Sequence, residues 1–157
     1  MKIECWSVGK QHDSYVKEGI ELFTKRTSHY YPIHWKIVPN IKNAAAFSPE
    51  QLREKEGEII LDSIKKDQVV FLLDEKGKNI SSPMLGTKIL KQAESGTNCL
   101  IFLIGGAYGV SDAVIRKANF VWSISELVFP HQLVRLILAE QIYRACSINN
   151  NEKYHHG

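Results

Sequence analysis

The stretch Ile101-Phe102-Leu103-Ile104-Gly105-Gly106-Ala107-Tyr108-Gly109 constrains the fold of this chain more than any other. Four apolar residues run directly into a glycine-rich loop, as happens where a buried strand ends at the edge of a sheet. Glycine permits backbone dihedrals and close approaches that a Cβ would block. We therefore expect the substrate to bind where this strand ends.

Short apolar segments alternate with helical patterns on both sides of this stretch. Strands are predicted at residues 3–8, 33–38, 68–73, 99–104 and 120–123. Helices are predicted at residues 12–26, 49–65, 83–94, 112–118 and 131–145. This alternation is typical of an α/β fold in which one mostly parallel sheet is flanked by helices.

Two helix starts carry strong local signals. Ser48, Pro49 and Gln51 form the pattern of a capping box with proline at the first helical position. Ser82-Pro83 repeats the first two elements of that pattern. Residues 39–47 have neither the helix nor the strand period, which indicates a surface loop between two regular elements.

Length and composition narrow the class of protein. A chain of 157 residues, 44% hydrophobic and 24% charged, is expected to form one globular domain over residues 1–157. Without a signal-peptide pattern or a membrane-length apolar run, we expect a cytoplasmic protein with no membrane partner. The net charge of +3 permits an anionic partner. Of the three scattered cysteines, two lie in apolar surroundings that favour buried inert thiols, and no metal site is predicted.

The last predicted helix is apolar on nearly every side. Its apolar residues are Leu133, Val134, Leu136, Ile137, Leu138, Ala139 and Ile142. A small domain cannot cover every face of such a helix, so we expect part of it to meet a second subunit in a homodimer. Glu140 and Arg144 are four residues apart and can pair on its surface.

The glycine loop has two further interpretations from its residues alone. Glu126 lies about twenty residues beyond Gly106, as an acidic ribose-binding residue does in a dinucleotide-binding fold. The Gly105-Gly106-x-x-Gly109 spacing and its place late in the chain do not fit that fingerprint. A tight strand-to-helix turn, with Ser111 capping the next helix, explains the glycines without a ligand.

Five short sequence motifs, spread along the chain, together resemble those of a known family. They are Leu72-Leu73-Asp74, Leu103-Ile104-Gly105-Gly106, Phe129-Pro130-His131-Gln132-Leu133-Val134-Arg135, Glu140-Gln141-Ile142-Tyr143-Arg144-Ala145 and Tyr154-His155. In these motifs the chain resembles the ribosomal large-subunit methyltransferase H family, the 23S ribosomal RNA pseudouridine N3-methyltransferases of the SPOUT class. The resemblance implies a C-terminal trefoil knot, which general connection rules would not predict. It also implies S-adenosylmethionine as cofactor, a homodimer, and large-subunit ribosomal RNA in the assembled ribosome as substrate.

Carried over residue by residue, the resemblance assigns cofactor contacts to eight residues. They are Leu73, Gly105, Ile124, Ser125, Glu126, Leu127, Val128 and Phe129. Apolar side chains among them can enclose adenine, while the main chain offers hydrogen bonds to its edge and to the ribose. A strand end leading into a helix near Pro130 is compatible with the same role for residues 124–129.

Methyl transfer to a uracil N3 requires loss of the N3 proton and alignment with the activated methyl group. Tyr154, His155 and His131 have side chains suited to proton transfer or hydrogen bonding. Arg144 can stabilise the base anion or bind phosphate. We expect Tyr154, His155 and Arg144 to be the catalytic residues. For His131, a capping or packing role is the alternative.

The C-terminal residues and the substrate each leave an alternative interpretation. An ending such as Tyr-His-His-Gly is in most proteins a frayed terminus, but Tyr154-His155 matches the ending of the family. His156 and Gly157 receive no role. A non-catalytic ribosome-binding factor is one alternative to the enzyme, and the retained glycines and Tyr-His ending count against it. A SPOUT methyltransferase acting on transfer RNA is the other, and the full-length resemblance counts against it.

Overall fold

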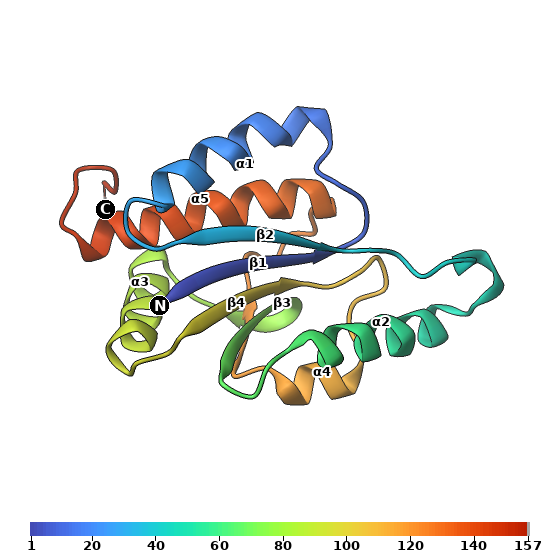
Figure 1. Cartoon of the computed structure of the whole chain (residues 1–157). Helices are drawn as coiled ribbons and strands as arrows, with labels where there is room; N and C mark the ends of the chain where they lie inside the picture. The colour runs from blue at the N-terminus through green and yellow to red at the C-terminus, as the bar shows by residue number, and fades with distance from the viewer. Residues whose placement is uncertain (157) are drawn as a thin grey trace.

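Five parallel strands form one sheet in the order β2-β1-β4-β3-β5, which confirms the predicted α/β class and all five strands (Figure 1). The structure is a computed structural model that describes residues 1–156. In chain order the elements are β1 Lys2–Val8, α1 Ser14–Thr27, β2 Ile33–Val38, a 3-10 turn Ala44–Ala46, α2 Pro49–Ser63, β3 Gln68–Asn79, α3 Ser82–Glu94, β4 Cys99–Ile104, α4 Asp112–Lys117, β5 Phe120–Ser123 and α5 His131–Asn149.

Helices cover both faces of the sheet. Helices α1, α3 and α5 lie on one face, and α2 and α4 lie on the other (Figure 1). The central strand β4 is buried along its whole length, as expected for a continuous apolar run covered on both sides. Its side chains alternate: Phe102 packs with Leu138 and Ile142 of α5, whereas Leu103 packs with Ile60 of α2.

The predicted helix starts are confirmed with one correction. At α2 the capping box is complete, because Ser48 Oγ accepts from the Gln51 amide at 3.2 Å and Gln51 Oε1 accepts from the Ser48 amide at 2.9 Å. At α3 the N-cap is Ser81 rather than the predicted Ser82. The Met84 amide donates to Ser81 Oγ at 3.3 Å, which places Ser82 inside the first turn.

Strand β3 is longer than its sequence predicts. The prediction ended at Leu73, but pairing with β5 resumes beyond a register shift, with Lys78 opposite Trp122. Gly77 permits this return, since a Cβ there would overlap the main chain of Trp122. Residues 74–79 are mostly polar and carry no apolar alternation, so they give no strand signal although their main chain pairs.

The last helix is also longer than predicted, and many of its apolar side chains are buried against other elements of the same chain. Helix α5 ends at Asn149 rather than near residue 145 and packs between α1 and α3 over the sheet (Figure 1). Buried within the chain are Leu138, Ala139, Ile142 and Ala145. Half-buried are Leu133, Val134 and Ile137. The homodimer and the trefoil knot both stay predictions.

The predicted inert thiols are confirmed as buried free cysteines. Burial raises the pKa of Cys99 to about 11 and that of Cys146 to about 12, so both stay protonated at neutral pH. Within residues 1–156, no helix has the length and apolar character needed to cross a membrane.

Candidate active site

The carboxyl ends of β4 and β5 lie beside Leu73 of β3. Leu73 pairs with Ile104, the last residue of β4, on one side and with Trp122 of β5 on the other, while β3 itself continues beyond its register shift to Asn79. The segments that follow these carboxyl ends are Gly105 to Gly109 after β4 and residues 124–129 after β5. We call Leu73 and these two segments the strand-end loops. The structure thus places side by side all three segments that were predicted to bind the cofactor.

The backbone geometry of the loop after β4 itself requires glycine at Gly105 and Gly109. The Gly109 amide donates to the Gly106 carbonyl at 3.1 Å, and Gly109 adopts a φ of 79°, which favours glycine. A Cβ on Gly105 would overlap the side chain of Val110. Ser111 then caps α4 by accepting from the Val114 amide at 3.5 Å. The tight-turn interpretation is therefore confirmed.

Residues 124–129 form a compact turn that exposes apolar side chains. Ser123 Oγ donates to the Ser125 carbonyl at 2.8 Å, and the Leu127 amide donates to Ser125 Oγ at 2.9 Å. Beyond the turn, Leu127 is 73% exposed and Val128 is 83% exposed. Two adjacent apolar residues with so much exposed surface suit contact with a flat ring or with another protein surface.

The first turns of α5 are fastened to the strand-end loops and to the loop after β1. His131 lies beside the main chain of Gly105; partial desolvation and the Arg135 charge lower its pKa, which keeps the imidazole neutral at neutral pH. Arg135 is buried and donates to Ser7 Oγ at 2.8 Å and to the Lys10 carbonyl at 2.9 Å. The motif around Pro130 thus contains a structural anchor, Arg135, to which no role was assigned from the sequence.

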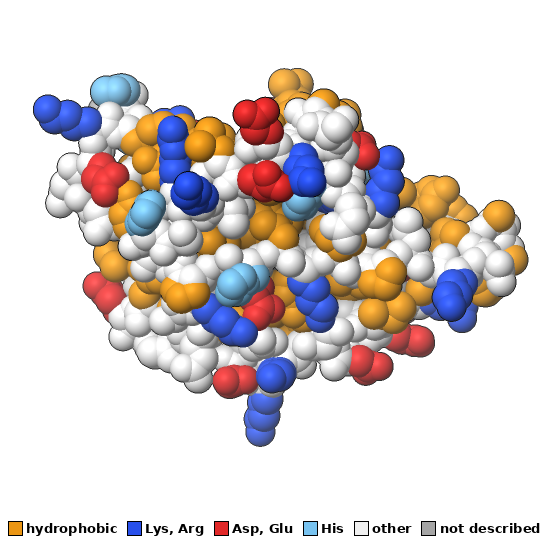
Figure 2. Space-filling view, turned by 45° about the horizontal axis from the view of Figure 1, so that its top comes forward, with side chains coloured by type: hydrophobic (Ala, Val, Ile, Leu, Met, Phe, Trp, Pro, Cys, Tyr) orange, Lys and Arg blue, Asp and Glu red, His pale blue; other side chains and the backbone are white. Residues whose placement is uncertain are grey.

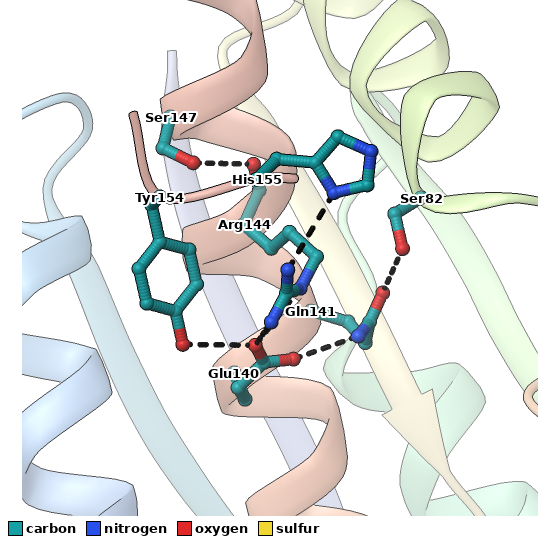
Figure 3. A network of polar contacts seen from close by, with 7 residues as sticks. All are labelled: Ser82, Glu140, Gln141, Arg144, Ser147, Tyr154 and His155. Atoms are coloured by element: carbon teal, nitrogen blue, oxygen red, sulfur yellow. Dashed lines mark hydrogen bonds and ion pairs between the residues drawn. The ribbon is translucent and has the colours of Figure 1, made fainter. Parts of the chain in front are cut away.

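A second group of functional side chains surrounds Glu140, near the middle of α5 (Figure 3). One oxygen of its carboxylate accepts from the Tyr154 hydroxyl at 3.0 Å and from Arg144 Nε at 2.9 Å. The other accepts from Gln141 Nε2 at 2.7 Å. Arg144 Nη1 lies 3.5 Å from His155 Nδ1. We call Glu140, Arg144, Tyr154 and His155 the tail cluster, and the structure brings the three predicted catalytic residues together in it.

The charges of the tail cluster set the protonation of its members. Burial and the hydrogen bond to Glu140 raise the pKa of Tyr154, so its hydroxyl stays a donor. The hydrogen bond to Glu140 also raises the pKa of Arg144. From the sequence, Glu140 was only a partner for Arg144; its contact with Tyr154 depends on how the tail folds back.

Aromatic rings and another cation adjoin the tail cluster. The Tyr143 ring lies 4.7 Å from the Tyr154 ring and 6.0 Å from Phe23 of α1, measured between centroids. Arg26, in the last turn of α1, holds its guanidinium 5.6 Å from the Tyr143 centroid. Figure 2 shows separate Lys, Arg and His side chains interspersed with apolar ones on the face that it presents. Sequence reasoning did not single out Arg26.

The two groups of predicted site residues lie far apart within one chain. Thirteen residues of helix separate His131, at the strand-end loops, from Arg144, a distance of about 20 Å at 1.5 Å per residue. The N-terminal end of α5 lies at the edge where the strands end, and the C-terminus lies at the opposite end of the molecule (Figure 1). The structure therefore brings together the residues predicted to bind the cofactor and, separately, those predicted to be catalytic, but does not join the two groups within one chain.

Comparison with known proteins defines the class first. A family model described as "Predicted SPOUT methyltransferase" matches residues 1–155, and the chain belongs to that family. Two solved structures share the fold. One, of a probable methyltransferase from Bordetella pertussis Tohama I, is 12% identical with a TM-score of 0.56 over 92% of this chain and 96% of that one. The other, of a probable methylase family protein from Haemophilus influenzae Rd KW20, is 11% identical with a TM-score of 0.54 over 99% and 70%.

Sequence relatives then narrow the family to one group. A protein from Cytophaga hutchinsonii named Ribosomal RNA large subunit methyltransferase H is 44% identical over 156 residues, 99% of this chain and 100% of the relative. Proteins of the same name from Parabacteroides distasonis and Flavobacterium johnsoniae are 42% and 40% identical over 99% of both chains. The family resemblance seen in the five sequence motifs is thus confirmed over the full length of the chain.

Proposed function

We propose that this protein transfers the methyl group of S-adenosylmethionine to N3 of a pseudouridine in 23S ribosomal RNA. The name shared by its relatives supports large-subunit ribosomal RNA as the substrate. The observation that carries the proposal is the tail cluster: Tyr154 and His155, which match the ending of the family, are held on Arg144 and Glu140 by side-chain contacts. A loose terminus would offer no such arrangement of donors.

The strand-end loops fit the proposed cofactor. Exposed Leu127 and Val128 offer apolar surface for adenine beside the bare main chain around Gly105. When bound, S-adenosylmethionine supplies a methyl group already activated on a sulfonium, so the protein has chiefly to align the acceptor. The trefoil knot implied by the class belongs to this proposal, because it would bring the segment after β5 against the other strand-end loops.

A homodimer with a shared active site follows from the distance between the two groups. Reacting atoms must approach to about 3–3.5 Å, which a separation of about 20 Å along α5 does not allow within one chain. A second copy related by two-fold symmetry can place its tail cluster against the strand-end loops of the first. Half-buried Leu133 and Ile137 of α5 and the exposed Leu127 and Val128 before it offer apolar surface for that contact.

The protonation states assign distinct tasks in the transfer. Arg144, held by Glu140, can stabilise the anion that forms when N3 loses its proton. Tyr154 stays a neutral donor and fixes the orientation of the tail. Two imidazoles can accept the proton, His155 in the tail cluster and His131 beside Gly105. The substrate is recognised on the assembled ribosome, in the cytoplasm, by a chain whose residues 1–157 act as one domain.

Transfer of labelled methyl groups tests the proposal. Ribosomes carrying the pseudouridine, free ribosomal RNA and transfer RNA are incubated with the protein and labelled S-adenosylmethionine, and the modified base is mapped. Methylation at N3 of the pseudouridine on ribosomes is the expected result. Methylation of transfer RNA alone would show that transfer RNA is the substrate instead of ribosomal RNA. Cofactor binding without methyl transfer to any of the three would support the alternative of a non-catalytic ribosome-binding factor.

A further inference from the structure

Helix α2 brings one carboxylate to the glycine loop. Glu56 lies on the covered side of α2, and its Oε2 occupies the space directly beside the main chain of Gly106. A Cβ on Gly106 would overlap that oxygen. Gly106 is therefore the residue that makes room for Glu56, since any side chain at this position would displace the carboxylate.

This carboxylate has no partner in its own chain. Within residues 1–156 no group donates a hydrogen bond to the Glu56 carboxylate, and the side chain takes part in none of the ion pairs. The side chain is half-buried, and this burial raises its pKa. A carboxylate that is drawn partly out of water without compensating hydrogen bonds is unfavourable for folding. Its neighbour Glu58, two residues along the same helix, is by contrast exposed to solvent.

The position of Glu56 indicates which hydrogen-bond donor could compensate the partial burial of its carboxylate. Gly106 follows Gly105, one of the residues assigned to the cofactor, and both lie in the strand-end loops. Of the polar side chains in those loops, Ser125 already accepts from the Leu127 amide and Glu126 is exposed to solvent, whereas the half-buried carboxylate of Glu56 lies beside the glycines themselves. S-adenosylmethionine carries an ammonium group and two ribose hydroxyls, and each of these needs an acceptor when it leaves water.

We propose that Glu56 is a further cofactor-binding residue whose carboxylate accepts a hydrogen bond from an N–H or O–H donor of S-adenosylmethionine. The inference rests on the proposed function for the identity of the cofactor. It explains in one step why Gly106 lacks a side chain and why α2 keeps an unpaired carboxylate against the loop. An acceptor of this kind adds affinity that the main chain and the apolar residues do not provide.

Binding of S-adenosylmethionine by isothermal titration calorimetry tests the inference, with Glu58→Gln as the matched control. Glu56→Gln is expected to weaken binding about tenfold or more, the effect of losing a hydrogen bond to a charged acceptor. Glu56→Asp, which withdraws the carboxylate by one methylene, should weaken it as well. Glu58→Gln should bind as the wild type does. Because the removed carboxylate is uncompensated, the melting temperature of Glu56→Gln should equal or exceed that of the wild type.

A second ligand identifies the donor. 5′-Methylthioadenosine keeps the ribose but lacks the ammonium group. If Glu56→Gln weakens binding of S-adenosylmethionine alone, the ammonium group is the donor; if it weakens binding of both ligands, the donor is a ribose hydroxyl or the adenine amino group. Wild-type affinity for S-adenosylmethionine in a folded Glu56→Gln protein would overturn the inference. Failure of the wild-type protein itself to bind S-adenosylmethionine would instead overturn the proposed function.

Discussion

The strand-end loops and the tail cluster offer two contrasting kinds of binding surface. The loops present main chain and exposed apolar side chains, with Leu127 73% exposed and Val128 83% exposed. The tail cluster is a set of side chains joined through one carboxylate, since Glu140 accepts from both Tyr154 and Arg144. A surface of the first kind tolerates changes of side chain, whereas the second depends on individual functional groups. This contrast matches a division between holding a cofactor and performing a reaction.

The strongest test of the contrast is Arg144→Gln. Loss of the guanidinium removes the group that stabilises the base anion, and we expect methyl transfer to fall by about a thousandfold. Affinity for S-adenosylmethionine should change little, because the role proposed for Arg144 is to stabilise the base anion and not to contact the cofactor. Single-turnover transfer and calorimetry measure the two quantities. Arg116→Gln, at an exposed position on α4, is the control. Equal losses of binding and transfer would break the contrast.

A second arginine of the same helix should behave in the opposite way. Arg135 is buried and fastens α5 to the loop after β1 through Ser7 and the Lys10 carbonyl. Arg135→Met should lower the free energy of unfolding by about 2–3 kcal/mol, because it leaves those oxygens unpaired. Chemical denaturation measures this, with exposed Lys91→Met as the control. A protein of unchanged stability but lost activity would mean that Arg135 belongs to the chemistry instead.

Glu140→Gln tests whether the tail is held from α5. The amide keeps an acceptor for Tyr154 but removes the charge that pairs with Arg144, so transfer should fall by about tenfold. Hydrogen exchange in residues 152–156 should become faster, because the tail loses its anchor. Exposed Glu94→Gln should alter neither quantity. Full transfer with a mobile tail would show that the order of the tail is unrelated to catalysis.

The smallest predicted effect concerns alkaline pH. Burial and Glu140 raise the pKa of Tyr154 in the folded protein. An unfolded tyrosine ionises near pH 10, so the unfolded state releases its proton first and stability falls as the pH rises beyond that value. Tyr30 and Tyr31 have raised pKa values too and act in the same direction. Melting temperatures between pH 9 and 11 should therefore decline less steeply in Tyr154→Phe than in the wild type. If the melting temperatures of the two proteins fall equally steeply with pH, the pKa of Tyr154 is not raised in the folded protein.

The two regions also differ in how well the sequence predicts them. All five strands were predictable because each is a short apolar run, and the α2 start was predictable because Ser48 and Gln51 form a local capping pattern. The strand-end loops follow from the same reasoning, since parallel strands end at one edge. The return of β3 beyond Leu73 was not predictable, because polar residues pair there through the main chain.

The tail cluster lies beyond such local rules. Two of the five sequence motifs contain its residues, but the contact of Tyr154 with Glu140 spans fourteen residues and depends on how the chain turns after α5. Glu56 is a similar case: nothing in its local sequence shows that it lies against Gly106, fifty residues away, because α2 and the glycine loop meet only in the folded chain. Contacts between distant elements are set by packing rather than by pattern.

The most direct test of the account is complementation between two inactive variants. Gly105→Arg blocks the strand-end loops and Tyr154→Phe disables the tail cluster; each is first shown to be folded and dimeric, then the two are mixed and allowed to exchange subunits. Half of the dimers are then mixed, each with one intact composite site, so about a quarter of wild-type methyl transfer should return. Dimers that exchange subunits but recover no transfer would contradict an active site shared between two chains.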